Sequence, residues 1–122
     1  MKENPLAMTM LYDFYGEVLT EKQKDFFDLY HNHDMSLGEI AENAQITRQG
    51  VRDVIVRATQ ILHDMEDKLG LVKRWKTIHS GLTEIAVAAV DIGKINDRSY
   101  GSSELRSYAQ RIHTLATGII EE

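Results

Sequence analysis

The sequence predicts an all-α fold, and three observations lead to this prediction. Apolar residues recur at spacings of three and four along most of the chain, which is the period of an amphipathic helix. Only one proline occurs among the 122 residues, and no stretch has low complexity. Serine or threonine residues precede several of the periodic stretches, at the position where such side chains cap helices. We therefore expect a single small helical domain followed by a helical extension.

Two helices are expected before residue 32. Pro5 fits the first turn of a helix, where its missing N–H costs nothing. Thr20 with Gln23 forms a capping box that begins a second helix, which we expect to end near His31. The apolar side chains of this second helix should pack on the segment that follows: Phe26, Phe27, Leu29 and Tyr30.

Residues 36–62 predict two helices joined by a tight turn, with the motif itself at about 36–58. Ser36 with Glu39 is another capping box, and Thr47 is placed to cap the second helix. Small Ala41 allows the two helices to approach closely. The first helix has an apolar face of Leu37, Ile40, Ala41 and Ala44, and the second has one of Val51, Val54, Ile55, Ala58, Ile61 and Leu62. This pattern favours a helix-turn-helix over a generic helical hairpin.

The exposed face of the second helix suggests a nucleic-acid contact. A helix-turn-helix places the start of its second helix in the major groove, where arginine pairs with guanine and glutamine with adenine. We therefore predict that the binding residues include those on this helix and a basic segment further on: Thr47, Arg48, Gln49, Arg52, Arg57, Lys73, Arg74 and Lys76. For the last three, simple solvation of a helix is an equally good explanation.

The segments LTEKQ, SLGEIAE and ITRQGV resemble region 4 of bacterial sigma factors. Together with LYDFYGEV, they resemble the YlxM family of small bacterial proteins over about the first two thirds of the chain. This resemblance implies an all-helical, sigma-region-4-like fold and a role in the signal recognition particle pathway, which for that family rests on gene neighbourhood. Two departures stand out: Gln45 lies where many helix-turn-helix turns have glycine, and Gly50 lies inside the recognition helix where members of the resembled family usually have alanine.

Residues 70–122 predict a helical extension that serves as a dimerisation arm, after a helix-turn-helix domain at 1–69. Gly70 interrupts the preceding helix, a turn is expected over 96–101, and Ser102 or Ser103 can cap the last helix. Two helices with alternating spacings of three and four carry more apolar surface than a small module can cover, which favours a homodimer. The predicted dimerisation residues are Leu71, Trp75, Ile78, Leu82, Ile85, Leu105, Tyr108, Ile112, Leu115 and Ile119.

Composition narrows the function classes. The chain has no cysteine and no apolar run long enough for a signal peptide core or a membrane span, so we expect a cytoplasmic protein that does not bind membranes. The net charge of −5 is uneven. Residues 1–44 carry −6, residues 45–80 carry +3 and residues 81–122 carry −2. The basic middle third suits a nucleic acid, but a charge of +3 predicts weak or salt-sensitive binding.

No constellation of catalytic residues or phosphate-binding loop is evident, so we do not expect an enzyme or a cofactor. His31, His33 and Asp34 lie together, but a helix end explains them better than a metal site does. Two functions remain. The first is a DNA-binding regulator, tied by resemblance to the signal recognition particle pathway. The alternative is an accessory factor that uses the same helical surface to bind the protein or RNA of that particle.

Overall fold

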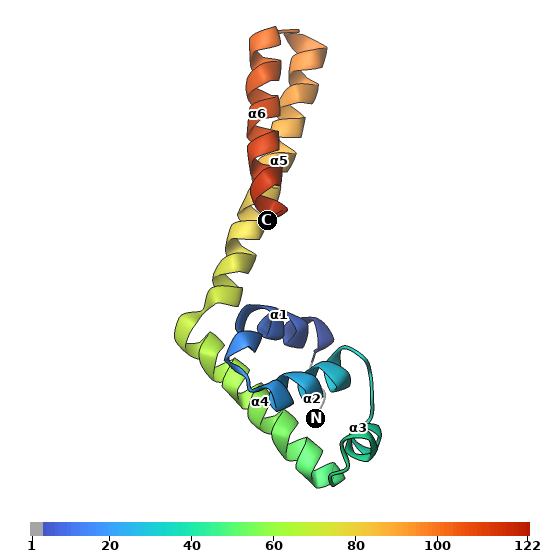
Figure 1. The fold of residues 1–122 in the computed structure, drawn as a ribbon. Coiled ribbons are helices and arrows are strands. Elements are labelled where there is room, and N and C mark those ends of the chain that lie inside the picture. The colour runs from blue at the N-terminus through green and yellow to red at the C-terminus, as the bar shows by residue number, and fades with distance from the viewer. Residues whose placement is uncertain (1–3) are drawn as a thin grey trace. The chain divides into compact units, whose positions relative to one another are not determined.

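The computed structural model describes residues 4–122, and these residues form six α-helices, one short 3-10 turn and no strand. Figure 1 shows the fold. The predicted all-α class is therefore confirmed. The chain divides into two compact units, residues 1–72 and residues 73–122, and each unit is defined by contacts within itself. None of the described helices combines the length and the apolar character needed to cross a membrane.

The helices of the first unit begin where the sequence places caps. Helix α1 (Pro5–Tyr15) is capped by Asn4, whose side chain accepts hydrogen bonds from the next backbone N–H groups, and it leads into the 3-10 turn η1 (Gly16–Val18). Helix α2 (Glu21–His31) begins with the predicted capping box of Thr20 and Gln23. Both caps satisfy N–H groups that have no partner inside the helix.

Helices α3 (Leu37–Ala44) and α4 (Arg48–Leu69) form the predicted helix-turn-helix. Ser36 and Glu39 make a capping box on α3, and the Thr47 hydroxyl accepts a hydrogen bond of 2.9 Å from the backbone of Gly50. Helix α3 ends at Gln45, which adopts the left-handed conformation with φ of 59°. The Ile46 N–H donates back to the Ala41 carbonyl, as in a Schellman ending, where glycine is the usual residue. Gln45 therefore adopts a backbone conformation that glycine adopts at lower cost.

The core of the first unit is divided into two clusters that lie along α4. One cluster joins α1, α2 and the second half of α4, and the other joins α2, α3 and the first half of α4. In Figure 1, α4 runs along the helices α1, α2 and α3. The largest side chains of this unit that are almost fully buried are Met8, Phe27, Ile40, Val51, Ile55 and Leu62. Because α4 contributes to both clusters, α3 holds its first half and α1 holds its second half, while α2 contacts both.

A buried polar contact joins the end of α4 to the start of α5 (Leu71–Ser99). Gly70 ends α4 in the left-handed conformation, with φ of 62°. The Tyr15 hydroxyl donates to the Glu66 carboxylate at 2.5 Å and accepts from the Leu71 N–H at 3.0 Å. The same carboxylate accepts from the Val72 N–H. Two of the free N–H groups in the first turn of α5, those of Leu71 and Val72, are therefore satisfied by side chains of α1 and α4.

The second unit is a hairpin of α5 and α6 (Ser103–Ile120). The turn predicted over 96–101 is wrong in extent, because α5 continues to Ser99 and the connection is shorter. Asn96 is buried inside the last turns of α5, where its side chain exchanges two hydrogen bonds with the backbone of Ser102. The Ser102 hydroxyl in turn caps α6. An asparagine that resembles a turn residue in sequence thus closes the hairpin from within a helix.

Candidate nucleic-acid interface

The first turns of α4 are held in place by the residues just before them. The Thr47 cap fixes the start of the helix, and Val51 and Ile55 anchor it in the core with side chains at most 1% exposed. Arg48, Arg52 and Arg57 are exposed on the same helix. No carboxylate among residues 4–122 forms an ion pair with any of these three guanidinium groups. They remain available to an external anion.

Arg48 and Arg52 lie together beside α3. They border a hollow of about 320 Å³ that is also lined by Leu37 and Gln49. The Arg48 side chain lies close to Gly38, because a Cβ atom built at Gly38 would stand 3.8 Å from Arg48 Cδ. This distance is an ordinary van der Waals contact, so the Arg48 side chain packs directly over Gly38. The structure thus brings together three predicted residues, and it adds Leu37 and Gly38, which sequence reasoning assigned only to the helix itself.

Gln49 has a partner on its own helix. Its side-chain amide donates a hydrogen bond of 2.8 Å to the carboxylate of Asp53, one turn further along α4. Gln60 and Asp64 repeat this pairing eleven residues, or about three turns, further along α4. The exposed side of α4 therefore carries two amide–carboxylate pairs, Gln49–Asp53 and Gln60–Asp64. Arg48 and Arg52 lie beside the first pair. Asp53 was not predicted as a site residue, although its spacing of four from Gln49 is the signal for a helical pair.

The remaining predicted basic residues lie elsewhere. Arg57 is exposed on α4 but does not line the hollow of Arg48 and Arg52. Lys73, Arg74 and Lys76 are exposed on α5 and belong to the second unit. No group of His, Cys, Asp and Glu side chains in the described part of the chain is arranged to hold a metal ion. His33 instead lies 3.2 Å from Asp28.

Comparison with known proteins identifies relatives. A family model described as "Putative helix-turn-helix protein, YlxM / p13 like" and named UPF0122 matches residues 2–98. A UPF0122 protein of Thermoanaerobacter sp. (strain X514) is 51% identical over 85 residues, covering 70% of this chain and 73% of the relative. A UPF0122 protein of Clostridium novyi (strain NT) is 38% identical over 102 residues, covering 84% of each chain. This chain belongs to the UPF0122 family of YlxM-like helix-turn-helix proteins.

Proposed function

We propose that this protein is a DNA-binding regulator that uses the start of α4 as its recognition helix. The observation that carries the proposal is the set of three exposed arginines without ion-pair partners, held on the second helix of a helix-turn-helix. Such a helix enters the major groove by its N-terminal turns. Arg48 and Arg52 occupy those turns, and Arg57 lies about one turn further along.

The Gln49–Asp53 pair determines which hydrogen-bonding groups the exposed side of α4 offers to a ligand. Because the Gln49 amide nitrogen donates to Asp53, its oxygen and the remaining carboxylate lone pairs are left as acceptors. Acceptors of this kind pair with the amino groups of cytosine or adenine in the major groove, whereas arginine donates to guanine. Asp53 also repels phosphate, so it disfavours unspecific binding more than binding to a matching sequence.

Arg52 and Lys73 provide the test of this assignment. If Arg52 contacts a base, Arg52→Ala should cost about 1–3 kcal/mol on a selected duplex and little on a random duplex. If Lys73 contacts only phosphate, Lys73→Ala should weaken both duplexes alike and reduce the salt dependence. Fluorescence anisotropy on both duplexes at several salt concentrations measures these effects. Equal losses on both duplexes for both variants would remove Arg52 as a base-reading residue.

We also propose that the protein is a homodimer through the α5–α6 hairpin. The predicted dimerisation residues of α5 and α6 are largely exposed within one chain, including Ile78, Ile85, Ile112 and Ile119 at 41–51%. Ile78, Ile85 and Ile92 are spaced by seven on α5, and Leu105, Ile112 and Ile119 are spaced by seven on α6. In an antiparallel hairpin these two stripes form one apolar face, which a second hairpin would cover as a four-helix bundle.

The alternative function is an accessory factor in the signal recognition particle pathway, where the same surface binds the protein or RNA of that particle. The charge of residues 1–44, which is −6, favours this alternative because it opposes wrapping by a long duplex. Purification from cells with and without nuclease distinguishes the two functions. DNA fragments that share one sequence would support the regulator, and recovered particle RNA or GTPase would support the accessory factor.

A further inference from the structure

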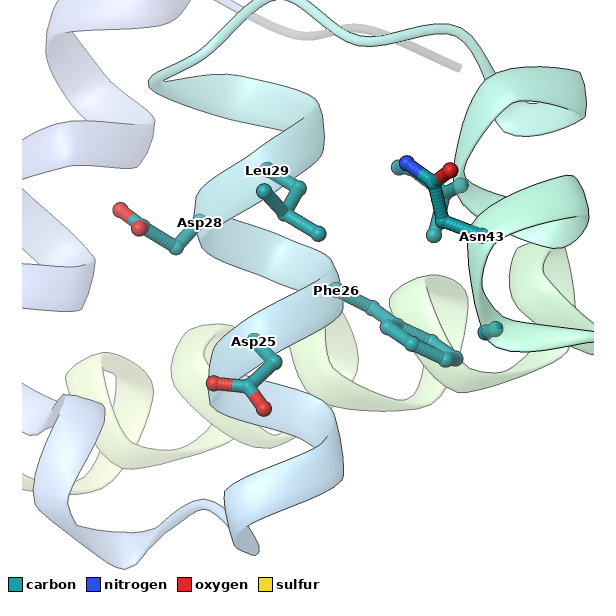
Figure 2. A pocket seen from close by; sticks show the side chains of 7 residues that line it. Asp25, Phe26, Asp28, Leu29 and Asn43 are labelled. Carbon is teal, nitrogen blue, oxygen red and sulfur yellow. The ribbon is translucent and has the colours of Figure 1, made fainter.

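A second hollow of the first unit lies between α2 and α3 and is separate from the arginine-lined hollow. Its volume is about 300 Å³, at the lower end of the range of ligand pockets. In Figure 2, Phe26 and Leu29 project from α2 towards α3, and Asn43 stands on the opposite side. It shares no lining residue with the hollow of Arg48 and Arg52. The lining residues are Asp25, Phe26, Asp28, Leu29, Ile40, Asn43 and Ala44.

The floor of this hollow is apolar, and its side chains are held in place by the core. Phe26 and Ile40 are only 7% and 1% exposed, and both belong to the core cluster around the first half of α4. Leu29 is half-buried, and Ala44 is too small to fill the space at the last turn of α3. A floor of this size accommodates one large apolar side chain from outside. It offers few of the polar groups that orient a small polar metabolite.

The rim on α2 is acidic. Asp25 is exposed and makes no hydrogen bond or ion pair within residues 4–122. Asp28 accepts a 2.7 Å hydrogen bond from Asn32 and lies beside His33. Lys22 places its ammonium group 5.9 Å from the Phe26 ring centre and His33 lies beside Asp28, so Asp25 is the carboxylate at this rim that is left for an outside cation. Carboxylates repel phosphate, which excludes nucleic acid as the occupant and favours a lysine or arginine.

We propose that this hollow is a docking site for a basic amphipathic helix of a partner protein. One large apolar side chain of that helix fills the floor between Phe26 and Ile40, and a lysine or arginine near it pairs with Asp25. Binding of this kind is the common mode in which an amphipathic helix lies in a groove and inserts a few apolar anchors. The site would allow the protein to hold a protein partner while α4 holds nucleic acid.

Synthetic helical peptides are suitable probes because the partner is defined here by its chemistry. The first peptide carries leucine on one face and lysine on the other, the second replaces each lysine by glutamate, and the third replaces each leucine by alanine. Binding to the full-length protein is monitored by NMR, through the backbone amide signals of an isotope-labelled sample. We expect the leucine–lysine peptide to shift the signals of Phe26, Leu29 and Asn43. The other two peptides should bind at least tenfold more weakly.

Two variants and one matched control locate the binding. Asp25→Lys reverses the charge of the rim, and Ala44→Leu fills the hollow from an exposed helical position. Each should weaken the leucine–lysine peptide at least tenfold. Asp13→Lys changes the net charge equally on exposed α1, outside the hollow, and should change the affinity less than twofold. Affinity for duplex DNA should remain unchanged in Ala44→Leu, so the docking site and the nucleic-acid surface are tested separately.

Three results would overturn the proposal. Signals that shift only outside the hollow would place the peptide elsewhere. Equal losses in Asp25→Lys and Asp13→Lys would show that general charge, rather than Asp25, attracts the peptide. A change in the oligomeric state of the protein alone in Asp25→Lys would show that a second copy of this chain occupies the hollow.

Discussion

The two units of this chain bury different kinds of side chain. In residues 4–72 the core is made of large apolar groups, with Phe27, Val51 and Leu62 fully inaccessible to solvent. In residues 73–122 the buried apolar residues are four alanines, Ala86, Ala89, Ala109 and Ala116. Burying an alanine removes far less apolar area from water than burying a leucine or phenylalanine. The first unit therefore has a core that can stabilise it alone, and the second has only a narrow seam.

The large apolar residues of the second unit remain outside that seam. Most of them exceed 40% exposure along both helices, for example Ile85 at 48%, Tyr108 at 51% and Leu115 at 63%, whereas Leu82 and Ile120 are half-buried. Monomeric proteins rarely expose a contiguous apolar face of this kind, and such faces mark interaction sites. The contrast between the two units supports the proposal that a second copy of the chain covers the apolar face of the second unit.

The largest expected effect is in the core of the first unit. Phe27 is 0% exposed and stacks on Tyr12 with ring centres 5.2 Å apart. Phe27→Ala should lower the free energy of unfolding by about 3–5 kcal/mol, since it removes buried surface and leaves a cavity. Thermal unfolding followed by circular dichroism measures this loss. A loss below about 1 kcal/mol would mean that the first unit does not depend on this core.

The next effect concerns the exposed face of the hairpin. Ile85→Asp combined with Ile112→Asp should convert the protein from dimer to monomer at micromolar concentration, because each copy would bury two carboxylates in the bundle. Val87→Asp is the matched control, since Val87 is 55% exposed but lies on the side of α5 away from Ala89. Analytical ultracentrifugation of the three proteins gives the comparison. Identical sedimentation of the double variant and the unmodified protein would contradict the dimer.

A smaller effect is expected where α1 holds the first turn of α5. Tyr15→Phe removes the hydroxyl that Leu71 and Glu66 contact, and it should cost about 1–3 kcal/mol by leaving a partly buried N–H unpaired. Chemical denaturation of both proteins measures the difference. If the stability does not change, this polar contact does not hold α5.

The difference in stability between Tyr15→Phe and the unmodified protein should depend on pH. Burial, followed by the hydrogen bond to Glu66, raises the pKa of Tyr15 above its usual value of 10.0. The protonated phenol therefore contributes stability that is complete below about pH 10 and is lost as the pH rises towards the folded-state pKa. Tyr15→Phe should lose less stability than the unmodified protein over this alkaline range. Parallel curves for the two proteins would contradict the raised pKa.

The smallest effect is expected at Gly50, in the first turn of α4. A Cβ atom there would lie 3.1 Å from the Thr47 hydroxyl oxygen and 3.5 Å from Ile46. The gain of about 1 kcal/mol in helix propensity should thus be offset by crowding of the cap, and Gly50→Ala should change stability by less than about 0.5 kcal/mol. Differential scanning calorimetry checks this. A gain of the full 1 kcal/mol would show that the cap adjusts freely.

Local signals in the sequence were sufficient for most of the fold. The capping boxes at Thr20 and Ser36, the Thr47 cap and the break at Gly70 all depend on residues within one helical turn, and each is found where the sequence predicted it. Asn96 was misread because asparagine favours turns in isolation. Here the packing of the hairpin buries it inside a helix, which is a tertiary effect that no local pattern contains.

The site was less accessible to sequence reasoning. The arginines of α4 were identified from residue type and helical position, but Leu37 and Gly38 join them only through the packing of α3 on α4. The Gln49–Asp53 hydrogen bond changes what Gln49 offers to a base, and it depends on side-chain conformation. The hollow between α2 and α3 arises from two helices whose separation in space the sequence does not specify.

The measurement that tests the central claim most directly is selection of binding sequences from a random pool of DNA duplexes, with a pool of structured RNA selected in parallel. A dimer that reads DNA through two copies of α4 should enrich one short sequence twice, at a fixed spacing and in inverted orientation. The enriched duplex should lose its advantage over random DNA when Arg52→Ala is used. If no duplex sequence is enriched while the RNA pool converges, the DNA-binding account is contradicted.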